Sequence, residues 1–183
     1  PGNCLMDNWV QHCLGHNFDA NGDFASSGQL QPQLLTQLLT DPYFQLTGPK
    51  STGREYFHLA WLEQHLQRLQ ADSHSLSLTD ADVQRTLSRF CAGTMALAIS
   101  RFMVKEVFVC GGGAHNSVLM ADLQALFPHC RISTTAELGV HPDWVEAMAF
   151  AWLAFAFDNQ IPGNVPAVTG ASKAVVLGVE FSV

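Results

Sequence analysis

The stretch "VFVCGGGAHNSVLM", residues 107–120, joins an apolar run, three consecutive glycines and the start of a helical pattern. The run 107–110 is apolar and partly β-branched, which predicts a short buried strand. Apolar residues return at helical spacing from Val118, so a strand, a glycine turn and a helix are predicted in that order. Each glycine costs about 0.5–1 kcal/mol relative to alanine inside a regular element, so three in succession need a local reason.

Two reasons for the glycines remain open on the residues alone. A ligand such as a nucleotide can lie against a glycine backbone, beside the free N–H groups of a helix N-terminus. Alternatively, the glycines only allow a strand and a helix to pack closely. Standard nucleotide-binding motifs do not distinguish these two reasons. Positions 111, 113 and 116 read Gly-Gly-Asn instead of the three glycines of the dinucleotide fingerprint, and the Walker A pattern is absent.

The rest of the chain is predicted to be mainly helical. Apolar spacing predicts helices over residues 4–14, 30–39, 59–70 and 80–103. Thr79 and Asp82 are spaced as a helix N-cap before the last of these, whereas residues 15–28 have turn-forming composition throughout. Helices that separate short strands predict an α/β fold with a small sheet and helical insertions.

Towards the C-terminus, residues 131–134 and 174–179 are predicted as short strands. Between them a helix should begin at Pro142 and run through "WVEAMAFAWLAFAF". This helix is apolar nearly all round, so we expect it to be buried. Its longest apolar run, residues 147–157, is too short to cross a bilayer, which takes about 20 residues.

Composition limits the partners. The 183 residues suit one domain, or one lobe of a larger protein. Charged residues make up 14%, against about 25% in typical soluble domains, so we expect part of the surface to be covered by another lobe, subunit or segment. The net charge of −7 argues against binding nucleic acid or an anionic membrane. Five cysteines without a C-x-x-C pair indicate reduced, mostly buried thiols in a cytoplasmic protein.

Four stretches, in one order along the chain, carry a family resemblance. They are "PGNCLMD" (1–7), "DPYFQLTGPKSTGREYF" (41–57), "VFVCGGGAHN" (107–116), and "TTAELGVHPDWVEAMAFAWLA" (134–154) followed by "VTGAS" (168–172). The glycine stretch looks like the adenosine-side motif of the sugar kinase, heat-shock and actin superfamily. The four together resemble the anhydro-N-acetylmuramic acid kinase family.

The resemblance implies that residues 1–183 form the C-terminal lobe of a two-lobed kinase with an actin-like, ribonuclease H-like fold. The catalytic base would be the aspartate of an Asp-Thr-Gly-Pro-Gly-Asn motif, just before Pro1, and the N-terminal lobe would lie upstream. The implied reaction opens 1,6-anhydro-N-acetylmuramic acid with water and transfers the γ-phosphoryl group of ATP to O6, with Mg²⁺, during cell-wall recycling. We therefore expect this chain to be inactive alone, to need its own N-terminal lobe, and to allow a homodimer.

The resemblance also implies site residues. Nucleotide-binding roles fall on Gly2, Asn3, Gly111, Gly112, Gly113 and Asn116. For Asn3 and Asn116, capping of the following helix is the alternative. Glu146, in the first turns of the apolar helix, is expected to bind sugar hydroxyls; compensation of the helix dipole is its alternative.

The sequence does not assign a role to the basic loop or to the histidines near the predicted site. The most basic loop of the chain runs from Lys50 to Arg54. It is either a solvated loop or, by resemblance, part of a cleft or a dimer contact. Just before it, Gly48 occupies a position where the family usually has proline. His115 is expected to be an exposed helix-start residue instead of a catalyst. No metal site is predicted, because the spacing of Cys4, His12, Cys13 and His16 fits no standard zinc site.

The rival functions are another sugar kinase of the superfamily and an actin-like module that binds nucleotide without catalysis.

Overall fold

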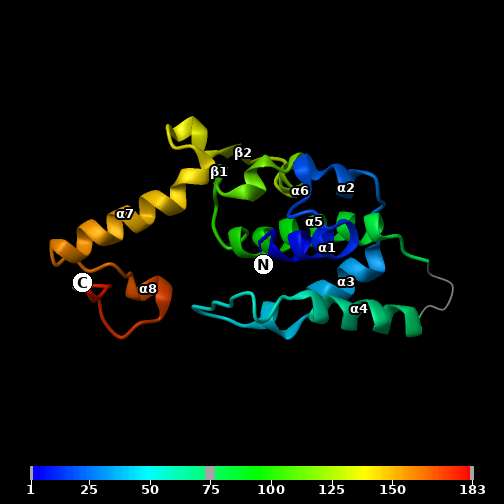
Figure 1. Cartoon of the computed structure of the whole chain (residues 1–183), viewed down its shortest axis with the longest axis horizontal. Helices are drawn as coiled ribbons and strands as arrows, with labels where there is room; N and C mark the ends of the chain where they lie inside the picture. The colour runs from blue at the N-terminus through cyan, green and yellow to red at the C-terminus, as the bar shows by residue number, and fades with distance from the viewer. Residues whose placement is uncertain (1, 73–76, 182–183) are drawn as a thin grey trace.

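The computed structural model describes residues 2–72 and 77–181 and shows a helical body from which one long helix extends (Figure 1). The elements of the body are α1 (Cys4–Leu14), η1 (Ala20–Gly22), α2 (Asp23–Ser26), α3 (Pro32–Leu39), η2 (Pro42–Gln45), α4 (Leu59–Asp72), α5 (Asp80–Ile99), β1 (Glu106–Val109), η3 (Gly112–His115), α6 (Ser117–Leu126), β2 (Arg131–Thr134) and η4 (Thr135–Leu138). They are followed by η5 (Pro142–Trp144), the extending α7 (Val145–Asp158) and α8 (Pro166–Thr169).

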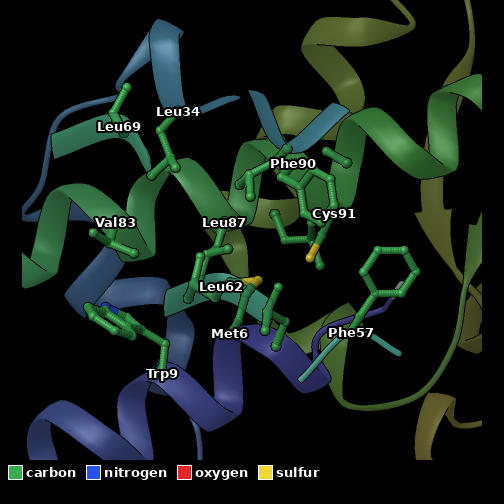
Figure 2. Close-up of a cluster of buried hydrophobic side chains, with 14 of the residues drawn as sticks. Met6, Trp9, Leu34, Phe57, Leu62, Leu69, Val83, Leu87, Phe90 and Cys91 are labelled. Carbon is green, nitrogen blue, oxygen red and sulfur yellow. The ribbon is translucent and has the colours of Figure 1, made fainter. Parts of the chain in front are cut away.

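Helix α5 is the centre of the body. The predicted cap is confirmed: Asp82 N donates to Thr79 Oγ1 at 3.1 Å and Thr79 N donates to Asp82 Oδ2 at 3.0 Å, which closes a capping box. The buried face of α5 carries Leu87 and Phe90, and side chains from α1, α3 and α4 pack around it (Figure 2). Burial of this face in a core shared with three helices positions α1 against α5.

Helix α6 is tied to α5 by one buried carboxylate. Arg85 Nη1 and Nη2 donate to Asp122 Oδ2 and Oδ1 at 2.6 and 2.9 Å, and Ser88 Oγ donates to Oδ2 at 2.9 Å. Arg89 adds a weaker ion pair to Asp122 at 3.5 Å. A buried charge held this way is strongly oriented, so it fixes α6 and the glycine turn that precedes it.

The sheet is smaller and more open than the sequence predicts. β1 and β2 pair in parallel, with Glu106 opposite Arg131 and Val109 opposite Thr134. The apolar residues of β1 are half-buried, not buried as predicted. Within the described residues, no third strand pairs with either edge of the sheet. The strand predicted at 174–179 is wrong: this segment has no strand assignment.

Segment 15–28 is not turns throughout, as predicted, because it contains η1 and α2. The side chain of Asp19, which is buried, organises it. Asp19 accepts hydrogen bonds from Phe24 N at 2.8 Å, from Ala25 N at 3.0 Å and from Gln84 Nε2 at 3.1 Å. A short helix therefore forms where composition indicates only turns.

The expected burial of the apolar helix is also wrong. In α7 only Ala156 is buried, and Phe150 and Phe155 are 64% and 57% exposed. The C-terminal segment covers one side, where Phe157 lies against Gly178. Nothing else in the described chain packs on the remaining faces, so α7 has an apolar surface without a partner.

All five cysteines are free thiols. Cys91 and Cys130 are buried, Cys110 is exposed, and Cys4 and Cys13 are half-buried, so fewer are buried than expected. None of the helices in the described segments combines the length and the apolar character needed to cross a membrane.

Candidate functional site

The glycine turn has the predicted order of strand, turn and helix. Gly111 adopts φ +74°, a conformation that side chains rarely allow, and its N–H donates to Pro142 O at 3.0 Å. Asn116 then caps α6, because its Oδ1 accepts from Leu119 N at 3.0 Å. The capping alternative for Asn116 is thus confirmed, while its Nδ2 has no hydrogen-bond partner among residues 2–72 and 77–181.

The first turn of α1 lies directly against the glycine turn. Asn3 precedes α1 but its side chain makes no cap hydrogen bond, so the capping alternative is wrong for this residue. Its Nδ2 donates instead to Asp7 Oδ2 at 2.8 Å. A Cβ added to Gly112 would lie 3.8 Å from Asn3 Nδ2, which brings together two segments more than a hundred residues apart in sequence.

These segments enclose a cavity of about 590 Å³, called here the glycine cavity. Its size is within the range of small-molecule sites. Four of the predicted nucleotide-binding residues line it: Asn3, Gly112, Gly113 and Asn116.

The other predicted site residues lie elsewhere. Gly111 shapes the turn but does not line the glycine cavity, and Gly2 lines a neighbouring cavity with the loop 50–54. Glu146 is exposed on the first turn of α7 and lines neither of these two cavities. The structure therefore does not bring Glu146 together with the glycine turn.

The sequence analysis did not name Asp7, His115 or Asp143, which also line the glycine cavity, as site residues. Asp7 lines it, and burial raises the pKa of Asp7 while the charge of Arg54 partly opposes the rise. His115 is exposed as expected, but its Nε2 lies 2.8 Å from Asp143 Oδ1, so both belong to the cavity rim. Helical spacing of Asn3 and Asp7 could have indicated Asp7; no local signal links His115 to Asp143.

A metal ion has no ready-made protein cage here. Among the described residues, no group of three or more His, Cys, Asp and Glu side chains is placed to hold a metal. The glycine cavity instead offers separate carboxylates: Asp19 is buried and already accepts three hydrogen bonds, whereas Asp7 is half-buried. Such a set suits a cation that arrives with a phosphate ligand, because Mg²⁺ usually takes one or two carboxylates and substrate phosphates.

Comparison with known proteins decides the family. The family model for anhydro-N-acetylmuramic acid kinase matches residues 1–183. The chain belongs to the anhydro-N-acetylmuramic acid kinase family. A protein of that name from Shewanella oneidensis is 49% identical over all of this chain, which covers 48% of the relative. One from Pseudomonas syringae pv. tomato is 47% identical over 97% of this chain and 48% of the relative.

The chain thus spans about half the length of the curated relatives it matches. The mixed α/β architecture, mostly helical with a two-stranded parallel sheet, is the one expected for a lobe of a sugar kinase.

Proposed function

We propose that this chain is the nucleotide-binding lobe of an anhydro-N-acetylmuramic acid kinase. The full-length parent would open 1,6-anhydro-N-acetylmuramic acid with water and phosphorylate it from ATP, giving N-acetylmuramic acid 6-phosphate in the cytoplasm. The observation that carries the proposal is the meeting of Asn3 with Gly112 and Gly113 at one cavity, in a chain of this family.

ATP would lie against the glycine turn. Gly112 is exposed and has no side chain of its own, so a phosphate or the ribose can approach its backbone beside Asn3. Helix α6 begins directly after this turn, and a helix N-terminus favours negative charge nearby. Asn116 caps α6 through its oxygen and keeps its Nδ2 for a ligand oxygen.

Mg²⁺ would be held by Asp7 together with the phosphates. Asp7 fits because one carboxylate oxygen accepts from Asn3 while the side chain faces the glycine cavity. When bound, Mg²⁺ neutralises charge on the transferred phosphoryl group. The protein's own contribution is then to position the reactants and exclude water.

The remaining half of the parent would form the other wall of the site. Two features of this lobe support that arrangement: the apolar surface of α7 is uncovered, and both edges of the β1–β2 sheet are unpaired within the described residues. An N-terminal lobe with the catalytic aspartate just before Pro1 would cover them, in an actin-like arrangement. Glu146, on the first turn of α7, would then face the sugar and bind its hydroxyl groups.

The test uses the purified full-length parent, with ATP and either 1,6-anhydro-N-acetylmuramic acid or ordinary hexoses, and detects products by mass spectrometry. We expect phosphorylated N-acetylmuramic acid from the first sugar only, and no product from residues 1–183 alone. Turnover of a hexose but not of the anhydro sugar would favour another sugar kinase. ATP binding without turnover of any sugar would favour a non-enzymatic module, and would contradict the proposal. Light scattering of the same sample decides whether the parent is a homodimer.

A further inference from the structure

A second cavity, of about 360 Å³, lies on the other side of the first turn of α1. We call it the loop cavity, because the loop 50–54 forms one wall and Gly2 forms part of another. Gly2 and Asn3 are consecutive, and Asn3 lines the glycine cavity. The two cavities are therefore separated by a single turn of backbone.

The loop is held firmly at both ends. The buried carboxylate of Asp41 accepts hydrogen bonds from Tyr43 N and Tyr56 Oη, both at 2.8 Å, and from Trp61 Nε1 at 3.0 Å. Phe57 is buried and stacks on Phe44, with ring centroids 5.6 Å apart. Anchors on either side restrict where the loop between them can lie.

The two cations of the loop are used differently. Lys50 Nζ donates to Tyr43 O at 3.0 Å and lies 4.9 Å from the centre of the Tyr43 ring, so its charge stabilises the conformation of the loop. Arg54 makes no hydrogen bond or ion pair with any residue of the described segments. Its charge nevertheless acts on Asp7 across the turn of α1, in the direction that lowers the pKa of Asp7.

Arg54 is therefore an unpaired guanidinium in the wall of the loop cavity, and its charge reaches Asp7 of the glycine cavity. We propose that Arg54 binds an anionic oxygen group of a reactant there; the inference rests on the proposed function. Both reactants carry such a group: the phosphates of ATP and the carboxylate of the muramic acid. A guanidinium fits either one, because its planar donors can pair with two oxygens at once. This assigns the loop to the reaction cleft.

The test compares Arg54→Gln and Arg54→Lys in the full-length parent with Arg68→Gln as the matched control. Arg68 is exposed on α4 and lines neither cavity. Calorimetry measures the affinity for ADP, a non-hydrolysable ATP analogue, 1,6-anhydro-N-acetylmuramic acid and the methyl ester of that acid. We expect Arg54→Gln to weaken one reactant about tenfold or more, since a hydrogen-bonded charge is lost, and Arg54→Lys to restore part of the loss.

The set of ligands whose affinity falls identifies the anionic group that Arg54 binds. Weaker binding of the ATP analogue, with ADP and both sugars unaffected, assigns Arg54 to the terminal phosphate; weaker binding of both nucleotides assigns it to the inner phosphates. Weaker binding of the acid, together with loss of its preference over the ester, assigns Arg54 to the carboxylate. The inference is overturned if Arg54→Gln keeps every affinity within about twofold, or changes only the oligomeric state. Because binding is measured directly, an inactive wild type would count against the proposed function while these titrations still decide Arg54.

Discussion

Replacing Gly112 with alanine should weaken nucleotide binding without destabilising the protein. Gly112 has no positive φ, and the atom nearest to an added Cβ is Asn3 Nδ2 at 3.8 Å, an ordinary contact distance. Alanine also reduces the conformational freedom of the unfolded chain. The free energy of unfolding should therefore stay constant or rise by up to about 1 kcal/mol.

The added methyl group would occupy the wall of the glycine cavity. It would hold a phosphate away from the N–H groups of Gly112 and Gly113. A hydrogen bond to a charged group contributes about 1.5–3 kcal/mol. Losing one such bond should weaken the affinity for ATP about ten- to a hundredfold.

Titration calorimetry with a non-hydrolysable ATP analogue, on the full-length parent, measures this loss. Gly93→Ala is the matched control: it lies in α5, and an added Cβ there would meet only Leu39, at 3.7 Å. Gly111→Ala is the contrasting variant, because its backbone conformation, φ +74° and ψ −176°, is almost confined to glycine and should cost about 1–3 kcal/mol of stability with any side chain. An affinity for Gly112→Ala within about twofold of wild type, with unchanged folding, would refute the reasoning.

Three further predictions concern the fold. Asp122→Ala should lower the free energy of unfolding by about 3 kcal/mol in a urea titration, because it leaves the charges on α5 unpaired; a loss below about 1 kcal/mol would be inconsistent with the role given to Asp122. Burial raises the pKa of the Cys91 thiol to about 12, so at pH 8 a thiol reagent should modify the exposed Cys110 in the native protein and Cys91 only after unfolding; equal native rates would contradict this. Burial lowers the pKa of His65, whose Nδ1 lies 2.9 Å from Gln37 Nε2. Below about pH 6.5, His65 therefore takes up a proton more readily in the unfolded chain than in the folded protein, so the free energy of unfolding falls with acidification. In thermal melts from pH 7.5 to 5, the melting temperature should fall less steeply for His65→Gln than for wild type. Equal slopes would exclude the effect.

Local patterns in the sequence predicted most of the elements. Thr79 and Asp82 identified the start of α5, and the glycine triplet marked the turn between β1 and α6. These predictions succeeded because caps and turns depend on neighbours within a few residues. Asp19 is the counterexample, since it accepts from Gln84, far along the chain, and stabilises a short helix among turn-forming residues.

Burial was harder to predict than helicity. The apolar composition of α7 indicates a helix that needs a partner, but not whether that partner lies within the same chain. Phe150 is 64% exposed because the described residues supply no such surface. The supposed strand at 174–179 fails for a related reason, because a strand needs a neighbour to pair with.

The candidate site was predicted only in part. Gly112, Gly113 and Asn3 were named from the resemblance, and the structure brings them together at one cavity. Their meeting depends on how α1 packs on α5, which no local pattern shows. The pairing of His115 with Asp143 likewise arises from tertiary packing.

A crystal structure of the full-length parent with a non-hydrolysable ATP analogue tests the central claim most directly. We predict phosphates against the backbone of Gly112 and Gly113, with Asn3 and Asp7 beside them. Nucleotide bound away from this turn, with the glycine cavity filled only by solvent, would contradict the account.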